Sequence, residues 1–416
     1  MCEGDAMSRH RLAVLLVNSL SDRGRPMEPV ALAQLAAVLR VAGFGSRILS
    51  CSQSADGIEQ ILSIIAIDQP AVVGMTMWSQ NAAFVLEICR AIKAQFPETV
   101  TVVGGYAVPR AVRTPDPSVN VYVIGEGELP LLRVIQEVTR GICPPPVLGP
   151  EPANVMLLPT PARDLVDFEQ IPFLEELDHP ALLCRRCSFV FTYRGCPASC
   201  SFCAMHEVYG RVIRKRPIES IMAELEDLVE MHGINAFINE EDMLFTDKSR
   251  VMAWCGAIEA SQHEFVWTCS GNVRCMDAEM LRALRRAGCK YIFLGSISGS
   301  DRILKEARAG FTVEHLDTAL RIAAEAGMPV SSSFLVGFPG ETKETLDETA
   351  KFILRNRDLY WDVGIGIIRP FDGAPLAARD CKREDGGATE IACEDLCEDD
   401  LCRFIERHTG VVNFTF

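Results

Sequence analysis

Two successive series of short β-branched runs, alternating with amphipathic stretches, restrict this chain to an α/β fold. In the first series, strands are expected at residues 12–17, 46–49, 71–75, 100–103 and 121–124. Between them, the segments 30–41 and 81–94 repeat apolar residues at helical spacing. Strands that are separated by helices pair in parallel, so this series predicts a doubly wound, Rossmann-like sheet.

The second series predicts a larger parallel sheet. Its strands are expected at residues 188–193, 236–239, 265–268, 291–294, 330–335 and 363–368. Its helices are expected at residues 218–231, 248–260, 278–287, 313–326 and 343–355. Six strands with crossover helices resemble an incomplete TIM-type (β/α)6 barrel, in which chemistry gathers at the C-terminal ends of the strands.

The stretch between the two series contains many prolines and little periodicity, which is typical of a linker. A chain of 416 residues also exceeds one ordinary hydrophobic core. We therefore expect a Rossmann-like domain over residues 10–142 and a linker over 143–180. A partial barrel over 181–370 and a short, acidic, cysteine-containing segment over 371–416 complete the expected organisation.

Three cysteines, Cys196, Cys200 and Cys203, follow the first expected barrel strand within a single short run. Three thiolates can hold three corners of a cubane iron-sulfur cluster, whereas a closed cluster needs four, so one iron is left open for chemistry. A structural zinc would recruit a fourth ligand, for which His206 is the nearby candidate. A disulfide would need an oxidising compartment, and the apolar run 12–17 is too short for a secretory signal. We favour the open cluster.

The composition of the chain indicates the cellular compartment and the classes of binding partner that are compatible with this chemistry. Hydrophobic residues make up 48% and charged residues 23%, and no stretch approaches the roughly 20 apolar residues of a membrane span. The net charge of -15 argues against a sequence-independent grip on nucleic acid. Seventeen cysteines without an export signal indicate a reducing compartment. We expect a cytoplasmic protein that binds neither membrane nor nucleic acid.

The spacing C-x3-C-x2-C, with Arg194-Gly195-Cys196-Pro197 at its start, resembles the radical S-adenosylmethionine (SAM) superfamily. Over residues 10–375, the chain is most similar to the class with an N-terminal cobalamin-binding domain. The resemblance implies a 4Fe-4S cluster on the three cysteines, whose open iron binds the amino and carboxylate groups of SAM. The reduced cluster would then cleave SAM to a 5'-deoxyadenosyl radical. An external electron donor of the flavodoxin or ferredoxin type and a small-molecule or peptide-derived substrate are also implied.

The resemblance further assigns cofactor-binding roles to residues near the ends of the barrel strands, namely Phe202, Glu240, Asn272, Arg274, Ser298 and Gly337. Phe202 would lie near the adenine, although an aromatic at that place could equally support the loop. Glu240 belongs to a short acidic motif that could instead be a solvated loop. One position departs from the family pattern: where many relatives carry glutamate, this chain has Ile297, which cannot accept a hydrogen bond or balance an ammonium group.

For the N-terminal domain, the resemblance places cobalamin beyond the strand ends, where Gly104, Gly105, Gly125, Glu126 and Gly127 fall. Glycines there let backbone approach a large ligand closely, although loops of this kind use glycine in any case. The motif that supplies a histidine ligand to cobalt in some relatives is missing, because no histidine lies between His10 and His179. Cobalamin would bind without that ligand; the competing hypothesis is a vestigial domain.

Two further groups of cysteines were considered as metal ligands. Cys184 and Cys187 flank two arginines, but in an extended segment their side chains would point to opposite faces. Cys393, Cys397 and Cys402 cannot share one face of a continuous helix, and the surrounding carboxylates would oppose thiolate formation. In the first case we favour an ordinary pre-barrel segment over a second metal site, and in the second an auxiliary cluster would need a break in the helix.

Together these observations predict a cobalamin-dependent radical SAM methyltransferase acting on an unactivated carbon or phosphorus. A radical rearrangement, a cyclisation or transfer of another part of SAM is the second hypothesis, to which Ile297 and the missing histidine give some support. A non-catalytic cobalamin or iron-sulfur regulator is the third. Transfer-RNA methylthiolation is disfavoured, because this chain ends in an acidic rather than a basic segment.

Overall fold

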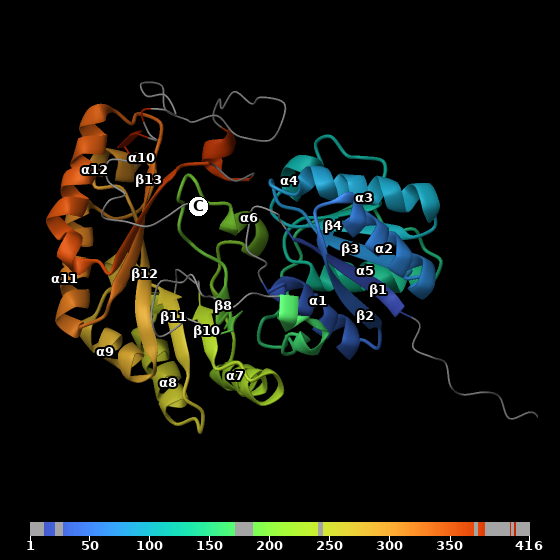
Figure 1. Cartoon of the computed structure of the whole chain (residues 1–416), viewed down its shortest axis with the longest axis horizontal. Coiled ribbons are helices and arrows are strands. Elements are labelled where there is room, and N and C mark those ends of the chain that lie inside the picture. The colour runs from blue at the N-terminus through green and yellow to red at the C-terminus, as the bar shows by residue number, and fades with distance from the viewer. Residues whose placement is uncertain are drawn as a thin grey trace, which may run out of the picture. The chain divides into compact units, whose positions relative to one another are not determined.

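The computed structural model describes residues 12–20, 28–170, 186–239, 244–369, 373–378, 400 and 403–404, and it divides into two units (Figure 1). The first unit takes in residues up to 172 together with 207–210, and the second takes in 173–206 and the chain from 211 onward. Within the described ranges, no helix is long and apolar enough to cross a membrane. Each unit is built on its own parallel sheet.

The first unit is the predicted doubly wound sheet. Its order is β2-β1-β3-β4-β5-β6, and all pairs are parallel. The strands are β1 (Leu12–Leu20), β2 (Gly45–Ser52), β3 (Val72–Thr76), β4 (Val100–Gly104), β5 (Val121–Val123) and β6 (Val147–Leu148). The helices are α1 (Val30–Val41), α2 (Ala55–Asp68), α3 (Ala82–Gln95), α4 (Val108–Ala111) and α5 (Glu128–Thr139).

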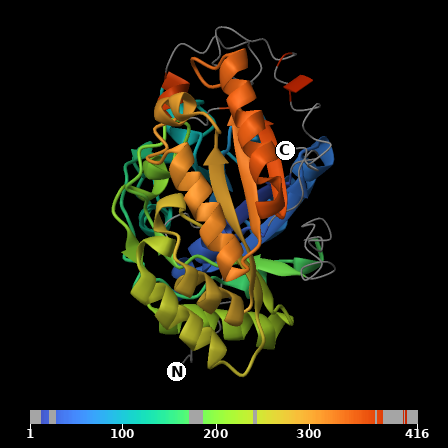
Figure 2. The same cartoon turned by 90° about the vertical axis from the view of Figure 1, so that its left-hand side faces the viewer.

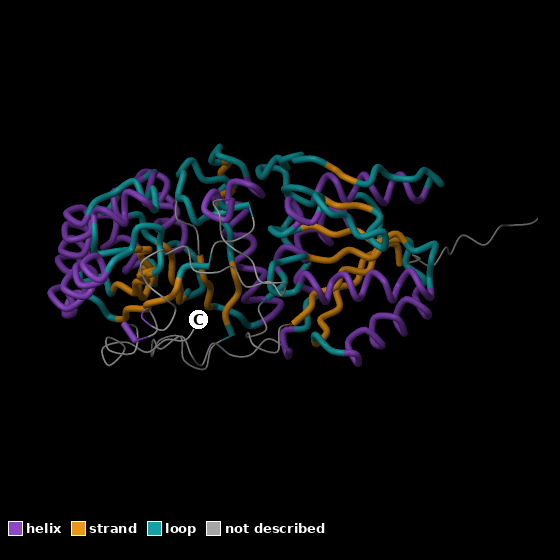
Figure 3. The backbone as a smooth tube through the Cα atoms, turned by 90° about the horizontal axis from the view of Figure 1, so that it is seen from above, coloured by secondary structure: helices purple, strands orange, loops and turns teal. Residues whose placement is uncertain are grey.

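Alternation along β1 explains why this sheet has two hydrophobic faces. Leu15 and Val17 join a buried cluster with α2 and α3, whereas Val14 and Leu16 join a second cluster with α1 and α5. Successive side chains of a strand point to opposite faces, so an uninterrupted apolar strand requires helices on both. Figure 3 shows helices on either side of these strands.

Part of the expected linker belongs to this first unit. Val147 pairs with Tyr122 and so adds β6 at the edge of the sheet. Further on, the Gln34 amide donates to the Pro159 carbonyl at 2.9 Å. A two-residue strand is too short to show periodicity, which is why proline content alone suggested a linker. The end of that segment, residues 171–180, lies outside the described part of the chain.

The second unit is the predicted partial barrel. Its sheet runs β7-β10-β11-β12-β13-β14, so each strand pairs in parallel with the strand of this sheet that follows it in the sequence. The strands are β7 (Cys187–Phe189), β10 (Ala236–Asn239), β11 (Val266–Ser270), β12 (Cys289–Ile297), β13 (Val330–Val336) and β14 (Asp362–Ile367). A small antiparallel pair, β8 (Tyr193–Arg194) with β9 (Arg214–Lys215), lies beside it.

Helices cover one face of this sheet, and Figure 2 shows the last two, in orange, lying along its strands. They are α7 (Ile218–His232), α8 (Lys248–Glu259), α9 (Ala278–Arg286), α10 (Asp301–Glu306), α11 (Val313–Ala326) and α12 (Lys343–Asn356). A short helix, α6 (Met205–Tyr209), follows the cysteine run. Local sequence fixes where several begin: Asp247 and Asp277 cap α8 and α9, and Thr312 and Thr342 form capping boxes for α11 and α12.

An aromatic cluster anchors α8 to the sheet. The rings of Phe237 on β10 and Trp267 on β11 stack with centroids 5.3 Å apart, and Trp254 of α8 packs 4.8 Å from Trp267. All three are at most 1% exposed. Aromatic side chains of this size contribute much of the buried area of a core, so they fix the helix against the two strands that lead to the candidate site.

Candidate functional site

The cysteine run begins after the first barrel strand, as expected, but the connection differs from the prediction. The strand expected over residues 188–193 ends at Phe189, and the chain then pairs again as β8 before it enters the run. Cys196, Cys200 and Cys203 are each half-buried. The thiols therefore lie on a loop that two separate strand pairings orient.

Ser201 holds the loop between its second and third cysteines. Its backbone N–H donates to the Ala307 carbonyl at 2.9 Å, and its hydroxyl donates to the Glu306 carbonyl at 3.2 Å. Its own carbonyl accepts from the Leu376 N–H at 2.7 Å. The last carbonyls of a helix lack partners within the helix, so the loop completes the C-terminus of α10 and is fixed by it. Sequence patterns gave no sign of this role, because Ser201 looks like an ordinary spacer.

Gly195 and Arg211 constrain the start of the same loop. Gly195 has φ +94°, and a Cβ atom there would lie 2.0 Å from the Val212 carbonyl oxygen. Only glycine tolerates both the positive φ and that close approach. The Arg211 guanidinium donates to the Ala198 carbonyl at 3.0 Å. The path of the chain into Cys196 is therefore set by backbone fit.

The cysteine run supplies three thiols as candidate ligands of a cluster. Across the residues that the structure describes, no group of three His, Cys, Asp or Glu side chains is placed to hold one metal ion. A cubane cluster places each thiolate on a different iron, so convergence is not required. The Met205 N–H donates to Cys203 Sγ at 3.4 Å, and hydrogen bonds to cluster sulfurs are one of the protein's means of setting cluster potential.

Phe202 contacts the turn that contains Gly337. Its ring packs edge to face against Phe338, with centroids 5.9 Å apart, and Phe338 is fully buried. Glu341 closes that turn, since its carboxylate accepts from the Gly337 N–H at 3.1 Å and from the Thr345 hydroxyl at 2.6 Å. Burial raises the pKa of Glu341. The structure thus joins two segments that the sequence placed in one site, and it gives Phe202 the supporting contact.

Asn272 and Arg274 lie directly after β11, where they were expected. The Asn272 side chain accepts from the Arg274 N–H at 3.0 Å and so starts a short 3-10 turn, Val273–Cys275. The Arg274 guanidinium donates to the Gly310 carbonyl at 3.0 Å. Both side chains therefore take part in shaping the loop beyond β11, and their contact with SAM stays a prediction.

The end of β12 forms a strained turn. Ile297 has φ +65° within a register shift of the strand and is only 6% exposed. A β-branched residue at positive φ is a backbone outlier that costs about 1–3 kcal/mol. Ser298, predicted to bind cofactor, is 1% exposed, lies 3.1 Å from the Thr349 hydroxyl and accepts from the Ser300 N–H. Its hydroxyl holds the turn closed.

Several predicted residues lie outside the described part of the chain: Glu240, Cys184, Cys393, Cys397 and Cys402. Next to Glu240, Asn239 is fully buried, and its amide donates to the Val190 carbonyl at 3.0 Å. Cys187 is 5% exposed on β7 within the sheet core. Because Cys184 lies outside the described residues, the expected orientation of the Cys184 and Cys187 side chains stays a prediction.

In the first unit, the predicted glycines do lie at the C-terminal edge of the sheet. Gly105 has φ +114°, and a Cβ atom there would lie 2.6 Å from the Met77 carbonyl oxygen, so the loops after β3 and β4 approach each other closely. Gly125 also has positive φ, and Gly127 precedes α5. Glu126 is 3% exposed and accepts from the Ala153 N–H at 3.0 Å, so its carboxylate secures the segment before residue 154.

Sequence reasoning missed the residue that joins the strand ends at the point where the sheet order reverses. Asn81 donates to the Ser19 hydroxyl at 2.9 Å and to the Thr76 carbonyl at 3.0 Å, and it accepts from the Trp78 N–H at 2.7 Å. In open parallel sheets, ligands bind beyond this reversal, here between β1 and β3. No local pattern marks Asn81, because its role depends on strand pairing.

Two aromatic rings lie at the same edge. Trp78, which follows β3, is 42% exposed, and its ring centroid is 5.0 Å from that of Tyr106, which follows β4. Exposed aromatic surface beside close backbone turns fits a large, flat ligand such as a corrin ring. No histidine occurs between His10 and His179.

Comparisons with known proteins match a part of each unit to a known domain. The family model of the radical SAM superfamily matches residues 190–353, and that of the B12 binding domain matches residues 20–135. An uncharacterised methyltransferase of Pyrococcus horikoshii is 26% identical over 84% of this chain and 77% of its own length. The cytidylyl-2-hydroxyethylphosphonate methyltransferase of Streptomyces wedmorensis is 23% identical over 92% of this chain and 83% of its own.

Among solved structures, the radical SAM methyltransferase TsrM of Kitasatospora setae, with cobalamin and a 4Fe-4S cluster bound, has the same fold. The TM-score is 0.70 at 19% identity, covering 95% of this chain and 85% of that one. The second unit has a six-stranded parallel sheet with a three-cysteine loop after its first strand, and the family model of the radical SAM superfamily matches it. These features define a radical SAM enzyme. The chain carries a radical SAM domain over residues 190–353 and a B12 binding domain over residues 20–135 before it, so its cofactors are a 4Fe-4S cluster, SAM and cobalamin.

Proposed function

We propose that this protein is a cobalamin-dependent radical SAM methyltransferase that acts on an unactivated carbon or phosphorus of a small metabolite. The observation that carries the proposal is the pairing of two units in one chain. One has a three-cysteine loop on a partial barrel, and the other is a doubly wound sheet whose residues 20–135 match the B12 binding domain. A methyl transfer to an unactivated position needs both radical chemistry and a methyl carrier.

In this proposal, Cys196, Cys200 and Cys203 hold the cluster and leave one iron for SAM. When bound, the cluster supplies the electron that splits SAM into methionine and a 5'-deoxyadenosyl radical, and cobalamin supplies the methyl carrier. The chain's part is to position SAM and the substrate and to exclude water from them. Phe202 and the turn around Gly337 form an apolar wall beside the cysteine loop, which suits the enclosure of a radical.

The remaining site assignments are also proposals. Asn272, Arg274 and Glu240 are assigned to SAM or substrate, and the backbone of the turn at Ser298 takes the place of the family's carboxylate. At the edge of the first unit, the backbones of Gly104, Gly105, Gly125 and Gly127 would admit the corrin. Trp78 and Tyr106 would pack against its face.

The two curated relatives described above are methyltransferases by name, which supports methylation as the outcome. Reduction of the cluster requires an external donor, for which we propose a flavodoxin or ferredoxin, and such donors act in the cytoplasm. A net charge of -15 gives no general attraction to nucleic acid, which supports a small-molecule substrate.

Anaerobic reconstitution tests this proposal. The protein would be loaded with iron, sulfide and hydroxocobalamin, desalted, and examined by ultraviolet-visible spectroscopy for both chromophores. It would then be incubated with methyl-deuterated SAM and a small-metabolite extract. We expect retained corrinoid and a product that carries the deuterated methyl group. A corrinoid-free protein would remove the cobalamin mechanism, whereas a product altered in mass without deuterium would favour rearrangement or cyclisation.

A further inference from the structure

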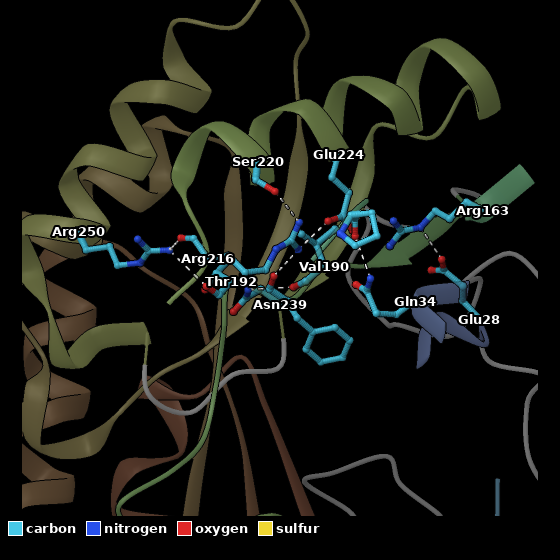
Figure 4. Close-up of polar contacts among 12 residues, drawn as sticks. Glu28, Gln34, Arg163, Val190, Thr192, Arg216, Ser220, Glu224, Asn239 and Arg250 are labelled. Carbon is cyan, nitrogen blue, oxygen red and sulfur yellow. Dashed lines mark hydrogen bonds and ion pairs between the residues drawn. The ribbon is translucent and has the colours of Figure 1, made fainter. Parts of the chain in front are cut away.

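The segment that connects β7 to β8 is held by side chains from three other elements. Three successive carbonyl groups, those of Val190, Phe191 and Thr192, each accept a hydrogen bond from a side chain (Figure 4). The donors are Asn239 at the end of β10, Arg216 before α7 and Arg250 of α8. Val190 and Thr192 are at most 1% exposed. Carbonyls outside the regular sheet ladder need other donors, and here each of the three receives a side-chain donor from a distant part of the sequence.

Arg216 is the centre of this group. Its guanidinium donates to the Phe191 carbonyl at 2.7 Å and pairs with the Glu224 carboxylate at 2.6 Å, while its backbone N–H donates to the Thr192 carbonyl at 2.9 Å. The Arg216 side chain is 8% exposed and that of Glu224 1%. The other terminal nitrogen of the guanidinium donates to the Ser220 hydroxyl at 3.3 Å, so the planar group reaches a carbonyl and a hydroxyl in fixed directions beside the carboxylate, which a lysine ammonium on a flexible stem cannot do.

Arg250 links the group to α8. Its guanidinium donates both to the Thr192 carbonyl and to the Arg216 carbonyl. Thr192 lies four residues before Cys196, with β8 and Gly195 between them. Between them, Tyr193 and Arg194 pair with Lys215 and Arg214, the two residues directly before Arg216, so the segment that Arg216 holds and the entrance to the cysteine loop belong to one hydrogen-bonded unit.

We propose that Arg216, paired with Glu224, is a positioning residue for the cluster: it fixes the strand-to-loop segment 190–192 and thereby the placement of the three thiolates. The inference deepens the proposed function and rests on it, because it assumes that Cys196, Cys200 and Cys203 carry the cluster. Groups that orient metal ligands without touching the metal change metal affinity by about 10–100-fold when they are replaced.

The chain offers a matched control for general stability. In the first unit, Arg163 and Glu28 form a buried ion pair of the same length, 2.6 Å, with side chains 4% and 0% exposed (Figure 4). Replacing either arginine by lysine keeps the charge and removes the guanidinium geometry. Both variants should lose similar stability, but Arg216 alone lies next to the path into the cysteine loop.

The experiment compares Arg216→Lys, Arg163→Lys and wild type after anaerobic reconstitution of the full chain. Three quantities are measured: the rate of iron loss to a chelator, the electron paramagnetic resonance spectrum of the reduced cluster, and hydrogen exchange over residues 190–203 in the cluster-free protein. We expect Arg216→Lys to lose iron about 10-fold faster, with a changed spectrum and faster exchange over that segment. Arg163→Lys should match wild type in all three.

A folded Arg216→Lys protein with wild-type iron loss, spectrum and exchange would overturn the inference. If Arg216→Lys does not fold, Arg250→Lys decides the matter, because it leaves the ion pair intact and removes donors to the same segment; an unchanged spectrum and iron-loss rate there would equally overturn it. Wild-type protein that holds no cluster would instead show that the proposed function itself is wrong, and the inference would fall with it.

Discussion

The backbone N–H of Ser298 donates a hydrogen bond to the carbonyl oxygen of Ser296 at 2.7 Å, which closes a γ-turn around Ile297. This turn has positive φ at its centre, the rare and strained form. It lies at the C-terminal end of β12, where the family pattern has glutamate and this chain has an apolar, buried side chain. The strain and the departure from the family pattern therefore fall on the same residue.

Replacing Ile297 should reverse the usual order of alanine and glycine. Both substitutions remove the buried side chain, but glycine adopts positive φ freely, whereas alanine pays about 1–2 kcal/mol there. We expect Ile297→Gly to have a free energy of unfolding about 1 kcal/mol higher than Ile297→Ala, measured by urea unfolding. Ile292, which is fully buried in the regular part of β12, is the control. At that position Ile292→Ala should be more stable than Ile292→Gly. The same order at both positions would contradict the strained turn.

Gly195→Ala should abolish cluster binding. The added methyl group would lie 2.0 Å from the Val212 carbonyl oxygen, so the entrance to the cysteine loop would have to move. We expect the reconstituted variant to retain little iron, as measured by iron and sulfide analysis. Gly233→Ala is the matched control, since Gly233 has φ +67° but no atom within 4 Å of the added Cβ. It should lose about 1 kcal/mol of stability and keep its iron. A fully loaded Gly195→Ala protein would show that the loop is not fixed there.

Mutations at the contact between Phe202 and Phe338 can distinguish the two roles suggested for Phe202, which are support of the loop and contact with the adenine. If the ring supports the loop, a double-mutant cycle with leucine substitutions should give a coupling of about 1 kcal/mol in stability. SAM affinity, measured by calorimetry, should then fall by a similar factor in Phe202→Leu and Phe338→Leu. A loss of affinity confined to Phe202→Leu, with additive stabilities, would instead indicate direct contact with the adenine.

Asp247 should give a pH-dependent contribution to stability. The Lys215 ammonium, then the Ser249 hydroxyl and the Arg250 N–H, hold the pKa of Asp247 well below its usual value of 3.8. A carboxyl with a depressed pKa stabilises the fold above its unfolded pKa, and this contribution is lost as pH falls through the folded pKa. We expect wild type to exceed Asp247→Asn by less than about 1 kcal/mol at neutral pH, because the pair is partly exposed.

Asparagine still caps a helix, so the comparison isolates the charge of Asp247. The difference in free energy of unfolding should be constant above about pH 5 and shrink as pH falls below 3.8. A difference that is independent of pH would mean that the carboxylate charge is not the source of the stabilisation.

The fold was largely predictable because its information is local and periodic. Ten of the structure's strands in the two main sheets follow apolar runs closely, and α1 (Val30–Val41) and α11 (Val313–Ala326) have the predicted bounds. The exceptions are short: β6 has two residues, and the strand expected over 188–193 is interrupted after Phe189. Two-residue pairings depend on the partner strand, which no local pattern reveals.

The candidate site was predictable only in part. The cysteines, the glycines and Ile297 stand out in the sequence because their chemistry or conformational freedom is unusual. The residues that hold them, such as Ser201, Asn81 and Arg216, act through backbone groups on elements far away in the chain. A serine, an asparagine or an arginine is common in loops, so its role becomes visible only once strand pairing brings the partners together.

The most direct test of the account is the formation of 5'-deoxyadenosine from SAM by anaerobically reconstituted, dithionite-reduced protein, compared with Cys200→Ala prepared in parallel. The account predicts 5'-deoxyadenosine from the wild-type protein and none above background from Cys200→Ala, whose cluster loses one of three protein ligands. A wild-type protein that carries a full complement of iron and sulfide yet forms no 5'-deoxyadenosine, or a Cys200→Ala variant that forms as much as wild type, would contradict it.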